Sequence, residues 1–398
     1  MGLFNRKIKD APLLEDLFSG NSDQALARHI VLNDINPLDD SGIWCNSTKY
    51  VNPVIIGSDL LSLYIARQMA LTCHYPNFND DKGINRTVIT IVDPCSNGRV
   101  ELEALKNRFE SISGNLLSEC IWSCTVYGKK TDTWCSTKVK SFLDVEFVFV
   151  GLEGIDVNSF VTDNLDADSR AIISVIDNSK LLSEQTISWI ETHCYQYYRI
   201  NENLVSNAES YCGVDVRRAQ VVNMIYEAGG HLQDIYMSDI YSVSAYKAAL
   251  ESFCLHTSIK KRQLFWDKIN DVSLKLSSLH CADLIETKIR CVKAGKSNIR
   301  QLTGTELELF AKSEHTRWNV EKLISGYRSY TAQEKYNDEC LFADKLALKA
   351  ERRRLKTEQH AHVDICSCNE LMRVDFESYK YDCFLTLAAD DIIRICPA

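Results

Sequence analysis

The stretch "VNPVIIGSDLLSLYIARQMALTC", residues 51–73, decides the fold class. It begins with a mostly apolar, β-branched run that ends at Gly57, and it continues with the apolar spacing of a helix. Continuous apolar runs are typical of strands that are buried on both faces of a parallel sheet. A strand that turns at a glycine into a helix is the first half of a β-α-β unit. We therefore predict an α/β protein.

Three more apolar, β-branched runs repeat the strand pattern, at residues 87–93, 145–152 and 171–177. Helical patterns alternate with these runs, at residues 59–73, 100–112 and 183–194. Strands that alternate with helices form a parallel sheet with helices on its faces. We therefore predict a Rossmann-like, doubly wound parallel sheet over residues 51–210.

The chain of 398 residues exceeds what one hydrophobic core normally organises, so two or three domains are expected. Residues 1–50 hold two short helical patterns and form an N-terminal extension. Strand patterns fade over residues 211–303, where helical patterns such as residues 242–256 predict a helical connector. Residues 304–398 are predicted to form a small, mainly helical C-terminal domain.

The composition excludes several classes of function. A formal net charge of −9 argues against a general binder of nucleic acids or anionic membranes, because both need a concentrated basic surface. No stretch approaches the roughly 18–20 uninterrupted apolar residues of a membrane span, and the first residues lack the apolar core of a signal peptide. The 16 cysteines of a chain this long indicate reduced thiols. We expect a cytoplasmic protein with no nucleic-acid partner.

The turn after the first predicted strand is a candidate nucleotide site. There the sequence has "GSDLLS" in place of G-x-G-x-x-G, so Asp59 and Ser62 occupy two of the three glycine positions. The Asp59 carboxylate would repel a pyrophosphate. The alternative explanation of Asp59 is that it caps the N-terminus of the following helix. Gly57, Ser58 and Asp93 are the candidate cofactor-binding residues, since Asp93 ends the second strand, where an adenosine ribose is normally held. The domain either binds no nucleotide or binds one differently, and intact NAD chemistry is disfavoured.

The segment "HAHVDICSC", residues 360–368, carries residue types that zinc favours. Its one-residue gaps do not match the Cys-x2–4-Cys and His-x3–5-His spacings of structural zinc sites. The nucleophile and phosphate-loop motifs G-x-S-x-G, H-E-x-x-H and Walker A are also missing from the sequence. We therefore assign no metal ligands and no catalytic residues, and we do not expect an enzyme.

The stretch "SEHTRWNVEKLISGYR", residues 313–328, predicts a helix that ends at Gly326. At about 100° per residue, the helix gathers an apolar stripe that includes Val320 and Leu323, whereas Trp318 falls on a different face. That second face also carries a carboxylate, an imidazole and an ammonium, from Glu314, His315 and Lys322. A large flat ring among such groups is either a ligand platform or part of a second core.

Along this helix, E-H-x-R-W followed by G-Y-R resembles the signature of the RyR domain, the module repeated in ryanodine receptors and found in many bacterial proteins. Residues 362–371 and 378–385 are similar to later segments of that domain, which implies a helix that opens on Asp382. Residues 265–289 are similar to the helical region before it in bacterial proteins. Those proteins often carry an N-terminal TrkA-N (KTN-like) Rossmann domain. Tyr327 stands where the family more usually has tryptophan.

The resemblance implies a soluble sensor or effector of a nucleotide-derived ligand, in bacterial signalling or anti-phage defence. Trp318 and Tyr327 could stack on a base or ribose, which contributes roughly 1–3 kcal/mol per stacked base. Three cations, Arg317, Lys322 and Arg328, are expected to contact phosphates. His315 could donate a hydrogen bond to a phosphate or to a base edge. A homodimer is expected because TrkA-N-like domains commonly pair.

Two alternatives stay open at this point. The first is an NAD(P)-dependent oxidoreductase that uses Gly57, Ser58 and Asp93. The second is a non-catalytic regulatory subunit of a separate membrane ion channel or of a defence complex. The sequence does not name the ligand, so the cofactor is unknown beyond a possible nucleotide.

Overall fold

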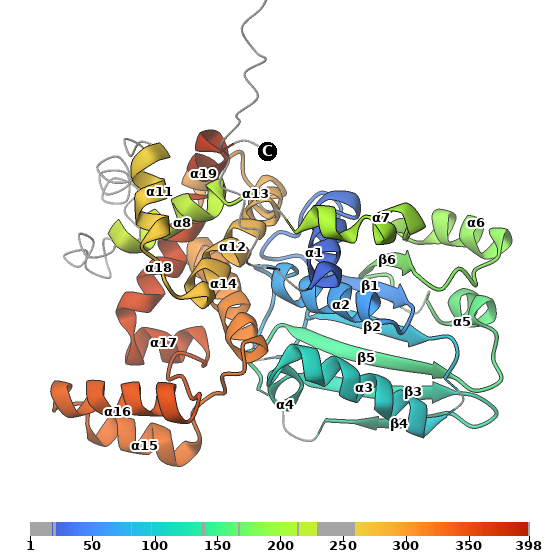
Figure 1. Cartoon of the computed structure of the whole chain (residues 1–398), viewed down its shortest axis with the longest axis horizontal. Coiled ribbons are helices and arrows are strands. Elements are labelled where there is room, and N and C mark those ends of the chain that lie inside the picture. Colours follow the sequence, from blue (N-terminus) through green and yellow to red (C-terminus); the bar gives the residue numbers. More distant parts are fainter. Residues whose placement is uncertain are drawn as a thin grey trace, which may run out of the picture.

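The computed structural model describes residue 18 and residues 21–80, 82–96, 98–136, 140–165, 168–212, 215–228 and 259–396. Within these residues, a sheet with the strand order β4-β3-β5-β2-β1-β6-β7 forms one half of the molecule, on the right in Figure 1. All neighbouring strands are parallel except β3 and β4. The strands are β1 (Tyr50–Ile56), β2 (Thr87–Asp93), β3 (Ile121–Tyr127), β4 (Asp132–Cys135), β5 (Val145–Leu152), β6 (Ala171–Asp177) and β7 (Gln196–Arg199).

Helices cover both faces of this sheet, as the continuous apolar strands require. Val51 and Ile55 of β1 belong to a core with α2 and α3, whereas Val54 and Ile56, on the opposite face, belong to a core with α5 and α6. The fold is therefore α/β with a largely parallel, Rossmann-like sheet, as predicted. The helices of this half are α2 (Leu60–Thr72), α3 (Arg99–Ser113), α4 (Leu116–Glu119), α5 (Val157–Asn164), α6 (Glu184–His193), α7 (Glu202–Ser206) and the 3-10 turn η3 (Ala208–Tyr211).

The four predicted strands are observed as β1, β2, β5 and β6, whereas β3, β4 and β7 were not predicted. These three lie toward the edges of the sheet, and most of their residues are only partly buried or exposed. A strand that is not buried on both faces lacks the continuous apolar run that identified the other four.

The C-terminal half consists of helices in the described residues, on the left in Figure 1. The helical pattern predicted at residues 242–256 lies outside the described residues. The elements are α8 (Arg217–Ala228), α11 (Ile259–Asp267), α12 (Val272–Asp283), α13 (Ile285–Lys293), η6 (Ile299–Gln301), α14 (Gly304–Ile324), α15 (Ala332–Cys340), α16 (Lys345–Glu358), α17 (Cys368–Val374), α18 (Phe376–Leu387) and α19 (Ala389–Ile395).

The expectation that a helix opens on Asp382 is wrong. Helix α18 begins at Phe376, and Asp375 is its N-cap, with a side-chain oxygen that accepts from the Ser378 N–H. Asp382 therefore lies inside the helix. Ser378, Tyr381 and Asp382 share one face of α18 because they are three and four residues apart.

Helix α14, which contains most of the helix predicted in residues 313–328, is well defined at both ends. Thr303 and Glu306 form a capping box at its start. At its end Gly326 adopts φ +85°, and the Tyr327 N–H donates to the Lys322 carbonyl at 2.9 Å. This is the glycine-terminated geometry predicted from the sequence.

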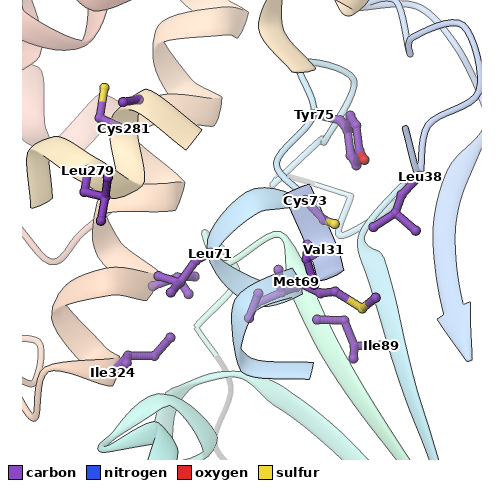
Figure 2. Packing of buried hydrophobic residues seen from close by; sticks show 14 of the residues in the cluster. Val31, Leu38, Met69, Leu71, Cys73, Tyr75, Ile89, Leu279, Cys281 and Ile324 are labelled. Atoms are coloured by element: carbon purple, nitrogen blue, oxygen red, sulfur yellow. The ribbon is translucent and has the colours of Figure 1, made fainter. Parts of the chain in front are cut away.

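The two halves share one continuous hydrophobic core. In Figure 2 the side chain of Leu71 points from α2 toward α12 and α14, which carry Leu279 and Ile324. Helix α1 (Ser22–His29) and the π-turn η2 (Ile30–Asp34) pack against the other side of α2. Because α2 is in contact with both α14 and the sheet, the position of α14 relative to the sheet is fixed by packing.

Of the helices that the described residues form, none combines the length and the apolar character that crossing a membrane requires.

Candidate functional site

The carboxyl edge of the sheet brings the three predicted cofactor residues together. Gly57 and Ser58 connect β1 to α2, and the Gly57 N–H donates to the Val92 carbonyl at 3.0 Å, beside Asp93 at the end of β2. The chain order of the sheet reverses between β1 and β6. In doubly wound sheets, ligands bind in the crevice at such a reversal.

Side chains of the protein itself occupy this crevice. Asn178, which follows β6, donates to both carboxylate oxygens of Asp59 at 2.7 Å and to the Ser62 hydroxyl at 3.0 Å. Asp59 in turn accepts from the Ser62 N–H at 2.9 Å and caps α2. The carboxylate thus sits at the helix N-terminus, where a pyrophosphate would otherwise bind.

Gly57 and Asp93 also have structural roles at this edge. Gly57 adopts φ +152°, and a side chain there would come within 2.6 Å of the Ser62 hydroxyl oxygen. Asp93 is largely buried and accepts from the N–H of Cys95 at 3.1 Å, in its own turn. Close packing therefore accounts for both residues without a cofactor.

Arg317, expected to contact phosphate, lies in a buried ion-pair network instead. Its side chain is 0 % exposed, and the guanidinium donates to Glu314 at 2.8 Å and to Glu321 at 2.7 Å. Lys288 of α13 also pairs with Glu314. Burial alone would lower the pKa of Arg317, but the two carboxylates outweigh it and hold that pKa well above its usual range. The expectation for Arg317 is corrected, because its partners are carboxylates of the same helix.

The other two cations are also paired within the protein. Lys322 is buried, donates to Glu321 at 3.0 Å, and lies 5.5 Å from the centre of the Trp318 ring. Arg328 forms a two-pronged pair with Glu334, with both nitrogen to oxygen distances at 2.8 Å. Arg317 and Lys322 thus share Glu321, Arg328 pairs with Glu334, and all three predicted phosphate-binding cations are engaged by carboxylates of the protein.

Trp318 and His315 line a cavity of about 70 Å³ between α8, α14, α18 and the loop before α17. Its other lining residues are Tyr226, Asp364, Ser378, Tyr381 and Asp382. Four of the seven, Tyr226, Trp318, Ser378 and Tyr381, are partly exposed. The remaining three, His315, Asp364 and Asp382, are buried. We conclude that the aromatic rings form the outer part of the cavity and the ionisable groups form its inner wall.

The rings around the cavity support one another. The Trp318 and His315 rings are nearly parallel, at 12°, with centroids 6.0 Å apart. His362 approaches Trp318 edge-on at 5.1 Å, and Tyr226 contacts Tyr381 at 5.0 Å. His315 Nε2 lies 3.0 Å from the Cys366 carbonyl oxygen, so this nitrogen carries the proton and holds the ring in place.

The inner wall carries two carboxyl groups. Asp364 accepts from the Ser378 hydroxyl at 3.4 Å through one oxygen, and burial raises its pKa to about 7. Asp382 lies with Oδ2 3.4 Å from His315 Nδ1, and burial raises its pKa as well. Neither residue was predicted as a site residue. The spacing of Ser378, Tyr381 and Asp382 on one helical face is the sequence signal that could have found this wall.

Tyr327, expected to stack on the ligand opposite Trp318, does not line the cavity. Its ring contacts the rings of His360 and His362, at 5.6 and 6.1 Å. Its place after the helix end sets this orientation, because the next residue, Arg328, pairs as a β-bridge with Ala361. Tyr327 therefore supports the segment that carries His362.

A larger cavity of about 310 Å³ lies between α1, η2, α8 and α12. Arginines and acidic residues line it, and they pair with one another as Arg28–Asp283, Arg217–Asp215 and Arg218–Glu286. These charges neutralise each other, so the cavity has no net preference for an anion or a cation. Among the described residues, no group of three or more His, Cys, Asp or Glu side chains is placed to hold a metal ion.

Comparisons of the chain with protein-family models, with curated proteins and with solved structures found no match.

Proposed function

We propose that this chain is a non-catalytic sensor of a small, nucleotide-derived ligand, with its receptor site at the Trp318 cavity. The observation that carries the proposal is the partly exposed Trp318 ring, parallel to His315, beside two buried carboxyl groups. A flat ring can stack on a base, and buried polar groups can fix the orientation of the bound ligand. The resemblance of residues 313–328 to the RyR domain points to the same two residues.

The anchoring of α14 supports a route from the cavity to the Rossmann-like half. Asn115, in the turn between α3 and α4, donates hydrogen bonds to the last turn of α14 and to the residues that follow it. Its N–H donates to the Leu323 carbonyl at 2.8 Å, and its side-chain amide donates to the carbonyls of Gly326 and Tyr327 at 2.7 and 3.0 Å. Leu323 is five residues beyond Trp318, about 8 Å along the helix axis. A shift of α14 on ligand binding would therefore reach the α3–α4 turn directly.

The carboxyl edge of the sheet is not a ligand site in this proposal. Asp59 and Asn178 occupy the helix N-terminus that a dinucleotide would need. We assign this half a structural or partner-binding role, in place of oxidoreductase chemistry. In keeping with the RyR and TrkA-N resemblance, the sensor would act in bacterial signalling or anti-phage defence, as a homodimer or with a separate effector.

Calorimetric titration with a panel of mono-, di- and cyclic nucleotides tests the proposal. Trp318→Ala is compared with Trp189→Ala, because Trp189 is also a partly exposed ring that stacks on a histidine, His193, at 4.4 Å, on the far face of the sheet. We expect one nucleotide class to bind the wild type and Trp189→Ala alike. Loss of the stacking in Trp318→Ala should weaken that binding roughly 5- to 150-fold.

Two results would overturn the proposal. The first is that no nucleotide of the panel binds the wild type. The second is that a nucleotide binds and Trp318→Ala leaves its affinity unchanged. NADH binding that survives Trp318→Ala would favour the oxidoreductase alternative.

A further inference from the structure

The inner wall of the Trp318 cavity offers hydrogen-bond acceptors that the protein does not satisfy. Asp364 is 7 % exposed, and its Oδ1 has no hydrogen-bond partner among the described residues. Asp382 is 6 % exposed, and its Oδ2 likewise has no hydrogen-bond partner among the described residues, with His315 Nδ1 at 3.4 Å. A buried acceptor without a partner costs about 1–3 kcal/mol. Such a group is commonly accounted for by a bound water, ion or ligand, and these two carboxyl groups line a cavity that could hold one.

A phosphate does not match this wall. Of the described residues that line the cavity, none is lysine or arginine, and two are carboxyl groups. Arg317 and Lys322, two of the cations expected to contact phosphate, both pair with Glu321. A phosphate in the cavity would therefore face two acidic groups, with no cation among the described lining residues to contact it.

The size of the cavity limits what can enter it. A volume of about 70 Å³ is small beside the roughly 300–1,000 Å³ of pockets that bury a whole drug-sized ligand. One edge of a planar ring, or a small planar cation, is of this size, whereas a whole nucleotide is not. The sugar and phosphates of a nucleotide would therefore stay outside, past the partly exposed rings of Trp318 and Tyr381.

We infer that the cavity selects its ligand through planar N–H donors, with Asp364 and Asp382 accepting from an amino or amidine edge while Trp318 covers the face of the ring. This inference rests on the proposed function and names the part of the ligand that the cavity recognises. The amino edge of guanine or adenine has this chemistry, and so does a free amidinium or guanidinium cation. Both can also gain from the aromatic faces, by stacking or by cation–π attraction.

Paired probes that differ by a single amino group test the inference by calorimetry. GMP is compared with IMP, AMP with purine riboside monophosphate, and benzamidinium serves as the free organic cation. Ribose 5-phosphate and inorganic phosphate are the probes without a donor ring. We expect an amino-bearing probe to bind the wild type at least about 10-fold more tightly than its partner without the amino group, as one good hydrogen bond to a buried acceptor provides.

Two variants locate the donor contacts. Asp364→Asn and Asp382→Asn keep the shape of the side chain but replace one acceptor oxygen with a donor nitrogen. Each should reduce the preference for the amino-bearing probe several-fold, whereas Trp318→Ala should weaken both members of a pair equally. Thermal unfolding of each variant checks that the fold is retained. One folded variant of the two is enough to test whether the preference for the amino-bearing probe depends on that carboxyl group.

The outcomes separate this inference from the proposed function. If GMP and IMP bind equally in a Trp318-dependent manner, the donor inference fails and the sensor proposal stands. If ribose 5-phosphate binds as tightly as the nucleotides, stacking of the base contributes nothing to affinity and both fail. If benzamidinium binds in an Asp364-dependent manner and no nucleotide binds, the donor inference stands and the nucleotide assignment fails. If no probe binds the wild type, both fail.

Discussion

The carboxyl edge of the sheet and the Trp318 cavity each combine acidic, polar and backbone groups, but they differ in how those groups are satisfied. At the sheet edge, Asn178 donates to Asp59, and Asp59 caps α2. In the cavity, Asp364 is almost fully buried and one of its oxygens has no partner among the described residues. At the sheet edge, the protein itself supplies hydrogen-bond donors to the Asp59 carboxylate. In the cavity, it supplies no donor to one oxygen of Asp364 among the described residues.

This difference separates a scaffold from a binding site by a physical criterion. A buried acceptor without a partner lowers the stability of the folded protein, so the cavity carries a cost that the sheet edge does not. A ligand that donates to the acceptor removes this cost when it binds. Substitutions in the two regions should therefore have opposite effects on stability.

The largest effect is expected in the ion-pair network behind the cavity. Glu314→Gln leaves the buried Arg317 and Lys288 without a full counter-charge, which should lower the free energy of unfolding by about 3–5 kcal/mol. Chemical denaturation measures the loss. Glu358→Gln, which breaks an exposed pair with Arg354 at 3.5 Å, is the control and should leave the free energy of unfolding almost unchanged. If Glu314→Gln instead left the stability unchanged and abolished ligand binding, Arg317 would have to be assigned to the binding site.

A smaller loss is expected where the sheet half holds α14. Gly114 has φ +58°, and a Cβ there would lie 2.5 Å from the Ile324 carbonyl oxygen. Gly114→Ala should therefore cost about 2–3 kcal/mol in the free energy of unfolding, from backbone strain and displacement of α14. Gly154→Ala is the matched control, because Gly154 has φ +69° but nothing within 4 Å of its Cβ position. Equal losses in the two variants would mean that the α14 contact contributes nothing.

Within the cavity, Asp364→Asn should stabilise the protein. Burial raises the pKa of Asp364 to about 7, above its value in the unfolded chain. The folded protein is therefore most stable below the unfolded pKa, where Asp364 is protonated, and it loses this stability as the pH rises through 7. The variant should therefore gain about 1–3 kcal/mol over the wild type at pH 8 and little at pH 4. Other ionisable groups that act on Asp364 are Asp375, His315, Arg352, Lys356 and the neighbouring His362. Denaturation at the two pH values measures the gain, and a loss at pH 8 would contradict the account.

At the sheet edge, the opposite sign and a smaller size are expected. Asp59→Ala removes the N-cap of α2 and should cost about 1 kcal/mol, with nucleotide binding at the Trp318 cavity unchanged. Asp156→Ala, which removes the N-cap of α5, should cost a similar amount. If Asp59→Ala weakens ligand binding while Asp156→Ala does not, the sheet edge belongs to the binding site.

Much of the fold followed from the sequence because its buried strands and the ends of α14 have local signals. The four central strands were continuous apolar runs, and Gly326 marked the helix end. Strand β3, which lies next to the edge strand β4, had no such run. The cavity could be predicted only in part. Trp318 and His315 stood out, but Asp364 joins them only because α8, α14 and α18 come together over long separations in the chain.

The error over Arg317 has a simple cause. Helical spacing showed that Arg317 lay near Glu314 and Glu321, at i−3 and i+4, which is the spacing of ion pairs on a helix. It did not show that neighbouring helices cover this face and that Lys288 of α13 reaches it. A helical pattern identifies a face, whereas tertiary packing decides whether solvent or another helix meets that face.

Fluorine NMR of protein labelled with 5-fluorotryptophan tests the central claim, that the Trp318 cavity is the ligand site, most directly. The chain has six tryptophans, and Trp318→Phe and Trp189→Phe assign the two resonances that matter. Saturating additions of GMP, AMP and benzamidinium should shift the Trp318 resonance, for at least one of the three, and leave that of Trp189 in place. A Trp318 resonance that stays unchanged with all three ligands would contradict the account.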